Sequence, residues 1–292
     1  MKKLTGMADF RQTRFRIKSK ILLLDSTTIS LCLSLFDWAV FRQRKGAIKL
    51  HTVLDYDGCL PVYVHMTDGK VHDSMPAKEI VLPKDAVVVA DRAYVDFPTL
   101  NNWDSNGSYF VVRLKTSVKF NRLKEKSLSE DRHGHILVDE YIELSEEKTR
   151  AKYPKKLRRV AVWDEENQQT IELITNQFSW TANTISELYK ARWEIETFFK
   201  EIKQLLKIKS FLGTSANAVL IQIWTALITI LMLKYLKASA KYGWCMSNLV
   251  AFLRLNLFVK FDLRKLLDEP FEPPPEPVLQ PVIQGVLFNW GD

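Results

Sequence analysis

The sequence predicts an α/β protein, and three features of the chain lead to this prediction. Two short apolar runs, residues 21–24 and 86–90, each end on an aspartate. Residues 109–175 are rich in β-branched and aromatic side chains and contain several strand-like stretches. Residues 189–203 follow as an amphipathic helix. Short apolar runs are typical of strands buried on both faces of a sheet, so the first two strands are expected to be central.

The two aspartates, Asp25 and Asp91, are the first candidate site residues. Ligands of open α/β sheets gather outside the carboxyl ends of the strands, so these two side chains are expected to meet there. A carboxylate at the end of a buried strand is costly unless it is paired or binds a metal. The alternative for Asp25 is an aspartate that caps a turn.

The helix over residues 189–203 carries the third candidate carboxylate. Thr184 is the expected N-cap, with Glu187 at the capping-box position three residues later. Helical geometry places four polar side chains within a stripe roughly 60° wide, along the border of the apolar face: Tyr189, Arg192, Glu196 and Lys203. A carboxylate flanked by arginine and lysine suits a metal and a polyanion. The alternative is an ordinary surface helix with weak ion pairs.

The remaining elements follow from local patterns. A hairpin is expected across the turn 55–58, with strands 48–54 and 60–65. Short helices are expected at 73–80 and 97–103, and strands at 110–114, 141–144, 157–163 and 170–175. The charged segments 119–132 and 146–156 are expected to be turns. An apolar run of ~16 residues at 218–233 is shorter than a membrane span and is expected to be a buried helix. Another helix is expected at 246–257, and the proline-rich stretch 269–281 as an extended tail.

The composition favours a polyanionic partner. The chain of 292 residues has a formal net charge of +8, with 47% apolar and 26% charged residues, and a basic protein of this kind is suited to nucleic acid. Residues 1–20 suit either a phosphate backbone or a basic chain end. Residues 36–45, which include Arg42, Arg44 and Lys45, interleave aromatic and basic side chains. They suit either a nucleic-acid surface or aromatic packing inward.

The cysteines and the start of the chain predict the compartment. Cys32, Cys59 and Cys245 are scattered and form no CxxC pair, which indicates a reducing compartment and argues against a thiolate metal site. His133 and His135 flank a glycine, a pattern typical of a turn. The basic start lacks a long apolar run close behind it, so no signal peptide is expected. We expect a cytoplasmic protein with no membrane partner.

Several motifs resemble one family. The spacing Tyr189-x2-Arg192-x3-Glu196-x6-Lys203 matches the YREK signature of bacterial transposases of the insertion-sequence-4 family. Asp25 followed by Ser-Thr resembles the first aspartate motif of that family, and Asp91-Arg92-Ala93-Tyr94 resembles the second. Residues 45–51 resemble the family's sequence between the two. The resemblance runs from about residue 21 to about residue 257.

The resemblance implies an RNase H-like catalytic fold interrupted by a β-rich insertion subdomain, with C-terminal helices. The expected parts are a basic segment (1–20), the core (21–108 and 179–262), the insertion (109–178) and a proline-rich tail (263–292). It also implies a DDE triad of Asp25, Asp91 and Glu196 that holds two Mg²⁺ ions, for which Mn²⁺ can substitute. DNA contacts are expected from basic and aromatic side chains near the triad: Tyr189, Arg192, Lys203, Arg92, Arg42, Arg44 and Lys45.

The implied activity is cut-and-paste transposition, in which DNA is cleaved at the element's ends, passes through a hairpin and is joined to target DNA. The implied partners are element ends and target DNA, with a homodimer on paired ends, in bacterial cytoplasm and on the nucleoid when bound to DNA. Family members carry a helical segment before the first aspartate, whereas Asp25 lies near the start of this chain. We therefore expect a transposase that lacks this segment. The alternatives are an impaired remnant that only binds DNA, and a nuclease on the same fold.

Overall fold

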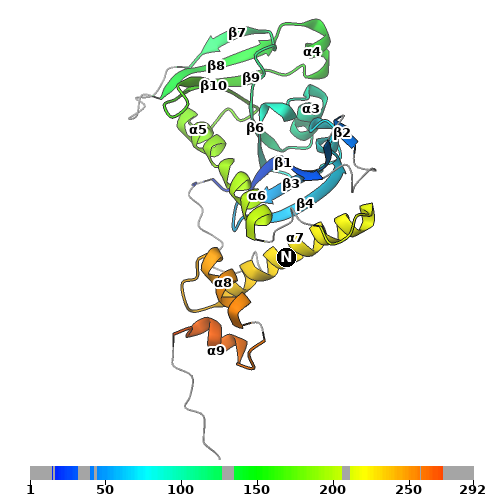
Figure 1. Ribbon diagram of the computed structural model, residues 1–292. Helices are drawn as coiled ribbons and strands as arrows, with labels where there is room; N and C mark the ends of the chain where they lie inside the picture. Colours follow the sequence, from blue (N-terminus) through cyan, green and yellow to red (C-terminus); the bar gives the residue numbers. More distant parts are fainter. Residues whose placement is uncertain are drawn as a thin grey trace, which may run out of the picture.

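The computed structural model describes residues 15, 17–31, 40–42, 45–126, 135–205, 211–256 and 258–271. A ten-stranded mixed sheet runs through the protein in the order β2-β3-β1-β5-β6-β10-β9-β8-β7, and β4 also pairs with β3. Helices cover both of its faces (Figure 1). The predicted α/β class is therefore confirmed.

The first half of the sheet holds the two predicted central strands. β1 (Ile21–Leu31) and β5 (Val87–Ala90) are parallel neighbours, and β6 (Tyr109–Arg113) is parallel to β5. On the other side of β1 the pairing is antiparallel, with β3 (Lys45–Asp55) and then β2 (Val40–Arg42) and β4 (Leu60–Asp68). The predicted hairpin is confirmed as β3 and β4, and its turn contains Gly58 with a φ of 86°.

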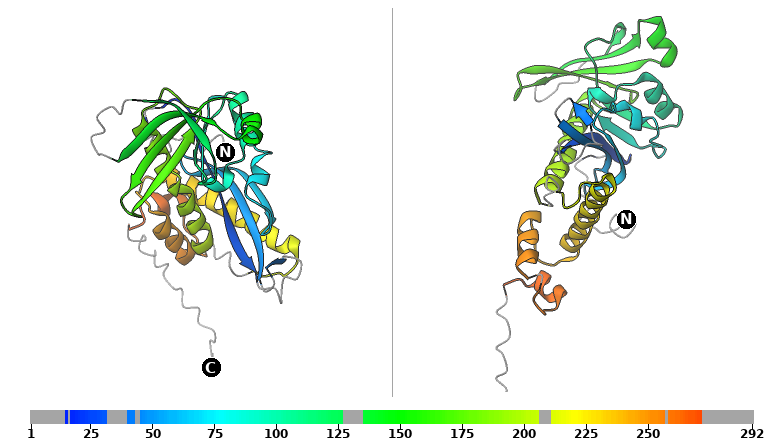
Figure 2. Two further views of the ribbon diagram at one scale, coloured as in Figure 1. Left: turned by 90° about the horizontal axis from the view of Figure 1, so that it is seen from above. Right: turned by 45° about the vertical axis from the view of Figure 1, so that its right-hand side comes forward.

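The second half continues the same sheet. β10 (Gln169–Thr175) is antiparallel to β6, and β9 (Leu157–Asp164), β8 (Ile136–Leu144) and β7 (Phe120–Glu125) follow antiparallel in turn. Figure 2 shows these strands at one end of the molecule. The predicted turn over residues 119–132 was wrong in part, because β7 occupies 120–125. Its side chains are exposed or half-exposed, so this edge strand lacks the apolar alternation that identifies a strand in sequence.

Two further short elements differ from expectation. The predicted turn at 146–156 contains α4 (Glu147–Lys152), which buries no side chain and so leaves no apolar pattern. The predicted helix at 73–80 is only α2 (Ser74–Ala77), followed by turns in which Glu79 and Ile80 donate to carbonyls three residues back. The helix predicted at 97–103 is confirmed as α3 (Phe97–Ser105), capped by the Asp96 carboxylate.

Two apolar layers sandwich the central strands. On one face Leu23 and Val89 pack with Ile195 and Ile223 from the helices after residue 181. On the other face Leu22, Leu24 and Val88 pack with Leu100 and Trp103 of α3. Successive residues of β1 therefore point to opposite layers.

The expected single helix at 189–203 is broken. α5 (Ala182–Lys190) and α6 (Trp193–Leu205) are separate helices, joined by a tight turn at Ala191 and Arg192. The N-cap is Thr181 rather than Thr184, since the Thr181 hydroxyl accepts from the Thr184 N–H at 3.1 Å. The local pattern missed the break because both helices keep their apolar faces on the same core.

The approach to α5 is fixed by a buried ion pair. Arg158 on β9 makes two hydrogen bonds of 2.7 Å to the Asp139 carboxylate on β8. The same guanidinium donates at 2.6 Å to the carbonyl of Trp180, just before the α5 N-cap. A charge-assisted bidentate pair of this kind is geometrically specific. The start of α5 is thereby tied to the second half of the sheet.

The buried helix expected at 218–233 is α7 (Ala216–Ser239), and it is buried along one face only. Ile223 and Ile230 are fully buried, whereas Trp224, Ile228 and Met232 are exposed. By length and composition alone α7 could cross a membrane, a test that core helices of soluble proteins also pass. α8 (Met246–Asn256) confirms the helix predicted there. Leu267 of α9 (Leu263–Asp268) packs with Leu249 of α8 and with Trp244, which lies just before α8. Most of the predicted basic start and proline-rich tail lies outside the described residues.

The corrected cap leads to a first prediction. Thr181→Ala should lower the free energy of unfolding by about 1 kcal/mol, because the Thr184 N–H loses its acceptor at the helix start. Thr184→Ala should cost less, since its side chain caps no backbone group. Urea unfolding of the two variants measures the difference. The reverse order would contradict the assignment of the cap.

Candidate active site

The parallel pairing of β1 with β5 brings Asp25 and Asp91 to the same place, as predicted. Leu24 of β1 lies opposite Ala90 of β5 in the parallel register, so both aspartates directly follow the paired segment. The expectation that the strand ends at Asp25 was wrong. β1 continues to Leu31, but beyond Leu24 its ladder is with β3 alone among the described residues. Asp25 therefore lies where the strand loses one neighbour.

The break between α5 and α6 delivers the third carboxylate and an arginine. Arg192, in the turn, donates from Nη1 to Asp25 Oδ2 at 2.7 Å, and its Nη2 lies 2.8 Å from Glu196 Oε1. The side chains of Arg192 and Asp25 are only 12% and 18% exposed. Tyr189, at the end of α5, donates its hydroxyl to Asp91 Oδ1 at 3.3 Å. Arg192 thus joins two of the predicted carboxylates, and Tyr189 holds the third.

The pKa of Asp25 reflects both its burial and the carboxylates around it. Burial raises the pKa of Asp25 to about 6, although Arg192 and the Ser26 N–H both lower it. Asp91 and Glu196 each raise the pKa of Asp25 further, which requires both to lie within electrostatic reach of it. Burial also raises the pKa of Tyr189 to about 12, and Asp91 adds to this shift. Tyr189 therefore remains a hydrogen-bond donor at neutral pH.

The donor set suits a hard divalent cation. Carboxylate oxygens are the ligands that Mg²⁺ and Mn²⁺ prefer. Within the described residues, however, no three His, Cys, Asp or Glu side chains are close enough to enclose an ion. Arg192 instead supplies the positive charge between Asp25 and Glu196. The donors fit a metal by type, and the guanidinium lies where a cation between those two carboxylates would lie.

A groove leads to this site along α6. It has a volume of about 390 Å³ and is lined by Asp25, Ser26, Thr27, Glu196, Phe199, Lys200, Lys203 and Gln204. Lys203, predicted as a DNA contact, therefore lines the same groove as two of the carboxylates. Lys200, one helical turn earlier, was missed because the signature spacing does not include it.

The other predicted DNA contacts differ in their surroundings. Tyr189 and Arg192 are largely buried and face the carboxylates, so the structure gives them positions that hold the site together. Arg92 is exposed at the start of η2 (Arg92–Tyr94), directly after Asp91. Arg44 and the side chains of Arg42 and Lys45 lie outside the described residues.

A polar cluster beside Asp25 was also missed. The Ser26 hydroxyl donates to Asp73 Oδ1 at 2.6 Å, and Lys49 Nζ lies 3.3 Å from the same oxygen. His51, opposite Ser26 on β3, is 1% exposed. Lys49 and His51 fall within the segment 45–51 that resembled the family, which was the available signal. Asp73, 47 residues from Ser26, gave none.

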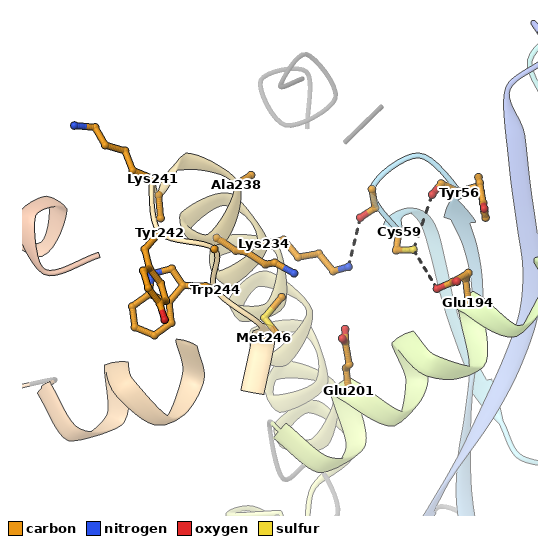
Figure 3. Close-up of a pocket in the computed structure, with 14 residues that line it drawn as sticks. Tyr56, Cys59, Glu194, Glu201, Lys234, Ala238, Lys241, Tyr242, Trp244 and Met246 are labelled. Atoms are coloured by element: carbon orange, nitrogen blue, oxygen red, sulfur yellow. Dashed lines mark hydrogen bonds between the residues drawn. The ribbon is translucent and has the colours of Figure 1, made fainter. Parts of the chain in front are cut away.

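A second cavity, of about 570 Å³, lies on another side of α6. Figure 3 shows Glu194 and Glu201 of α6 facing Lys234 of α7 across this cavity, which Cys59 also lines. Burial raises the pKa of the Cys59 thiol to about 11, so the thiol stays protonated at neutral pH. This cavity shares no lining residue with the groove of Asp25 and Glu196.

The family follows from a comparison with known proteins. The model of the transposase DDE domain matches residues 16–232. The chain belongs to the transposase DDE domain family. This confirms the DDE transposase resemblance at the level of the domain, and α6 with Glu196 falls inside the match.

Three relatives agree with this DDE domain. The chain is 29% identical over 84% of its length to the probable transposase of insertion sequence element IS5377 from Geobacillus stearothermophilus. It is 30% identical over 93% of its length to a protein named as transposase y4zB from Sinorhizobium fredii. It is 26% identical over 79% of its length to one named for element IS4SA from Synechocystis. The chain spans 64%, 75% and 64% of these relatives, respectively.

The fold of the DDE domain has a solved counterpart. A piggyBac transposase, solved as a synaptic complex with hairpin DNA, superposes with a TM-score of 0.50 at 13% identity. The match covers 86% of this chain and 57% of that chain. At this identity the likeness is one of fold.

The raised pKa of Asp25 predicts how stability depends on pH. The folded DDE domain keeps the proton up to about pH 6, whereas the unfolded chain releases it near 3.8. The stabilising effect of the neutral carboxyl is fully present below pH 3.8 and is lost as the pH rises through about 6. The free energy of unfolding of the wild type, relative to Asp25→Asn, should therefore fall by about 3 kcal/mol over this range. Urea unfolding in metal-free buffer at several pH values tests this, and a constant difference would contradict it.

Proposed function

We propose that this chain is the catalytic region of an insertion-sequence transposase of the insertion-sequence-4 type, with Tyr189, Arg192, Glu196 and Lys203 as its YREK residues. In this proposal it cleaves DNA at the ends of its element and joins them to target DNA. The observation that carries it is the closeness of three carboxylates, since Asp91 and Glu196 both act on the pKa of Asp25. Tyr189 and Arg192, two signature residues, donate hydrogen bonds to Asp91 and Asp25, respectively. The family match and the relatives named for insertion sequences support it.

We further propose an RNase H-like core with a β-rich insertion. The run β4-β3-β1-β5-β6, antiparallel and then parallel, supports such a core, with two carboxylates directly after the paired segment of β1 and β5 and the third on α6. Because β6 pairs with β5, we place the start of the insertion after Arg113 rather than at residue 109. The insertion then comprises β7 to β10, and the core resumes at about residue 179.

The side chains divide the proposed work among them. Asp25, Asp91 and Glu196 would hold two Mg²⁺ ions, or Mn²⁺, which when bound activate the attacking oxygen and stabilise the leaving one. Tyr189 orients the Asp91 carboxylate by its hydrogen bond. Arg192 neutralises Asp25 and Glu196 and must release at least one of them to make room for a cation. Lys200 and Lys203 line the groove, where ammonium groups suit DNA phosphates.

The partners follow from the same proposal. The DNA of the element's ends and of the target would lie along the groove of α6, with exposed Arg92 beside Asp91. Two copies would hold the paired ends, and the protein would work in the bacterial cytoplasm on nucleoid DNA. The net charge of +8 supports a polyanionic substrate.

The test is cleavage of a labelled duplex that carries the element's own terminal sequence. The duplex is incubated with Mg²⁺, with Mn²⁺ and with EDTA, and the products are separated on a denaturing gel. Metal-dependent hairpins or joined strands at the terminal sequence are the expected result. Nicks at random positions would indicate a nuclease instead. Salt-sensitive binding without cleavage in either metal would indicate a protein that only binds DNA.

A further inference from the structure

Asp73 has an unusual position for an aspartate at the start of a helix. It occupies the N-cap of α2, yet its side chain makes no capping hydrogen bond. Its Oδ1 instead accepts from the Ser26 hydroxyl at 2.6 Å, and Lys49 Nζ lies 3.3 Å from the same oxygen. The usual role of a helix-start aspartate, which is to satisfy a free N–H, is therefore not the role of Asp73.

The cluster around Asp73 lies behind Asp25, on the opposite face of the sheet. Leu23 belongs to the apolar layer beneath α5, α6 and α7, whereas Leu22 and Leu24 belong to the layer beneath α3. By the same alternation Asp25 faces Arg192, and Ser26 faces Asp73. The two faces are joined at one point, because the Ser26 N–H donates to Asp25 Oδ1 at 2.7 Å.

The backbone at this point needs an additional restraint. β1 has β3 and β5 on its two sides only as far as Leu24, and from Asp25 onward its described ladder is with β3. The segment that carries Asp25 has therefore lost one row of lateral hydrogen bonds. The bond from Ser26 to Asp73 supplies an attachment on one face of the sheet, at the residue that follows Asp25.

Buried polar groups keep Asp73 in place. Lys49 and Asp73 are 14% and 22% exposed, and Lys49 also donates to the carbonyl of Val71 at 2.9 Å. His51 donates or accepts at 2.9 Å with Thr67 through Nε2. Its buried Nδ1 lies 3.7 Å from Asp73 and has no hydrogen-bond partner in the part of the chain that the structure describes. Burial lowers the pKa of His51 to about 4, although Asp73 raises it, so His51 is neutral at pH 7.

Such a cluster is a costly way to stabilise a fold. A buried ion pair often contributes less than apolar side chains of similar volume, and a buried nitrogen without a partner adds a penalty. A polar cluster of this cost is explained if it fixes the geometry of a neighbouring functional group. In metal sites, residues that hydrogen-bond to the ligands orient them in this way.

We propose that Asp73 is a positioning residue for Asp25. By holding Ser26 it fixes the end of the β1–β5 ladder and the orientation of the Asp25 carboxylate, so that this carboxylate is ready to bind a divalent cation. Lys49 and His51 support Asp73 in this role. The proposal rests on the proposed function, in which Asp25 is a metal ligand.

The test is Mn²⁺ binding to the full chain, measured by isothermal titration calorimetry. Asp73→Ala and Ser26→Ala should each weaken binding by about 10- to 100-fold, the usual effect of losing an outer partner of a ligand. The double variant should bind Mn²⁺ no more weakly than Asp73→Ala, because both changes remove the same hydrogen bond between Ser26 and Asp73. Ser26→Ala removes only a hydroxyl and tests the same path if Asp73→Ala does not fold.

Asp104→Ala is the matched control. Asp104 has a side chain that is 18% exposed, a lysine partner at 2.8 Å and a hydroxyl donor, the Tyr153 phenol, but no bond to the site. It should lose stability and keep its Mn²⁺ affinity. Equal Mn²⁺ affinity of Ser26→Ala, Asp73→Ala and wild type would overturn the proposal, as would equal weakening in Asp104→Ala. If wild type and Asp25→Asn bind Mn²⁺ alike, the proposed metal site itself fails, and this proposal falls with it.

Discussion

Glu196→Gln should reduce metal-dependent DNA cleavage by at least about 10³-fold. Loss of an outer partner of a ligand already costs about 10- to 100-fold, so loss of a direct ligand should cost more. Glutamine keeps the size of the side chain and can still accept from Arg192, and Glu196 lies at the border of the groove. The melting temperature should therefore change little. Initial cleavage rates with Mg²⁺ and Mn²⁺ measure the effect.

Glu194→Gln is the matched control for this prediction. Glu194 lies in the same first turn of α6, but it faces the second cavity rather than the groove (Figure 3). It should keep cleavage close to wild type. Cleavage by Glu196→Gln at the wild-type rate would remove Glu196 from the triad. An equal loss in Glu194→Gln would show that α6 tolerates no change of charge, rather than that one carboxylate is a ligand.

Arg192→Ala should lower the free energy of unfolding by about 3–5 kcal/mol in metal-free buffer at neutral pH. Arg192 is 12% exposed and pairs with both Asp25 and Glu196, so its removal leaves two carboxylates without their cation. Breaking a partly buried pair is costly because the remaining charge is uncompensated. The loss should shrink in acid, since Asp25, with a pKa of about 6 even beside Arg192, becomes neutral.

Divalent cations distinguish this prediction from simple loss of packing. Mn²⁺ at saturating concentration should restore part of the stability of Arg192→Ala, because a ligand that binds only the folded state stabilises it. Arg264→Ala is the control. Arg264 and Asp268 form the same i,i+4 arrangement as Arg192 and Glu196, but Arg264 is 60% exposed. Its replacement should cost less than about 1 kcal/mol and show no response to metal. An Arg192→Ala protein as stable as wild type would refute the central role of this guanidinium.

The two predictions together describe how Arg192 and metal would exchange. In the structure the guanidinium of Arg192 bridges the carboxylates of Asp25 and Glu196. A divalent ion placed between the same carboxylates would have to displace it.

The sequence by itself determined the features that depend on local pattern. The apolar runs before Asp25 and Asp91 predicted two central strands and the meeting of their ends, because continuous apolar runs are buried on both faces of a sheet. The turn 55–58 predicted its hairpin. The motifs at Asp25, Asp91 and Glu196 predicted a DDE domain, which the family match confirms at the level of the domain.

Only the tertiary structure decided the features that depend on contacts between distant residues. The helix breaks at Arg192 so that its guanidinium can reach Asp25, 167 residues away, and no local propensity encodes that contact. β7 is a strand because β8 provides its hydrogen-bond partners, although its side chains lack an apolar face. Asp73 leaves its helix uncapped because Ser26 and Lys49 offer it stronger partners once the sheet has formed. Local sequence determines which side of a helix or strand is apolar. Which buried charges pair is determined only when helices and strands that are distant in sequence pack together.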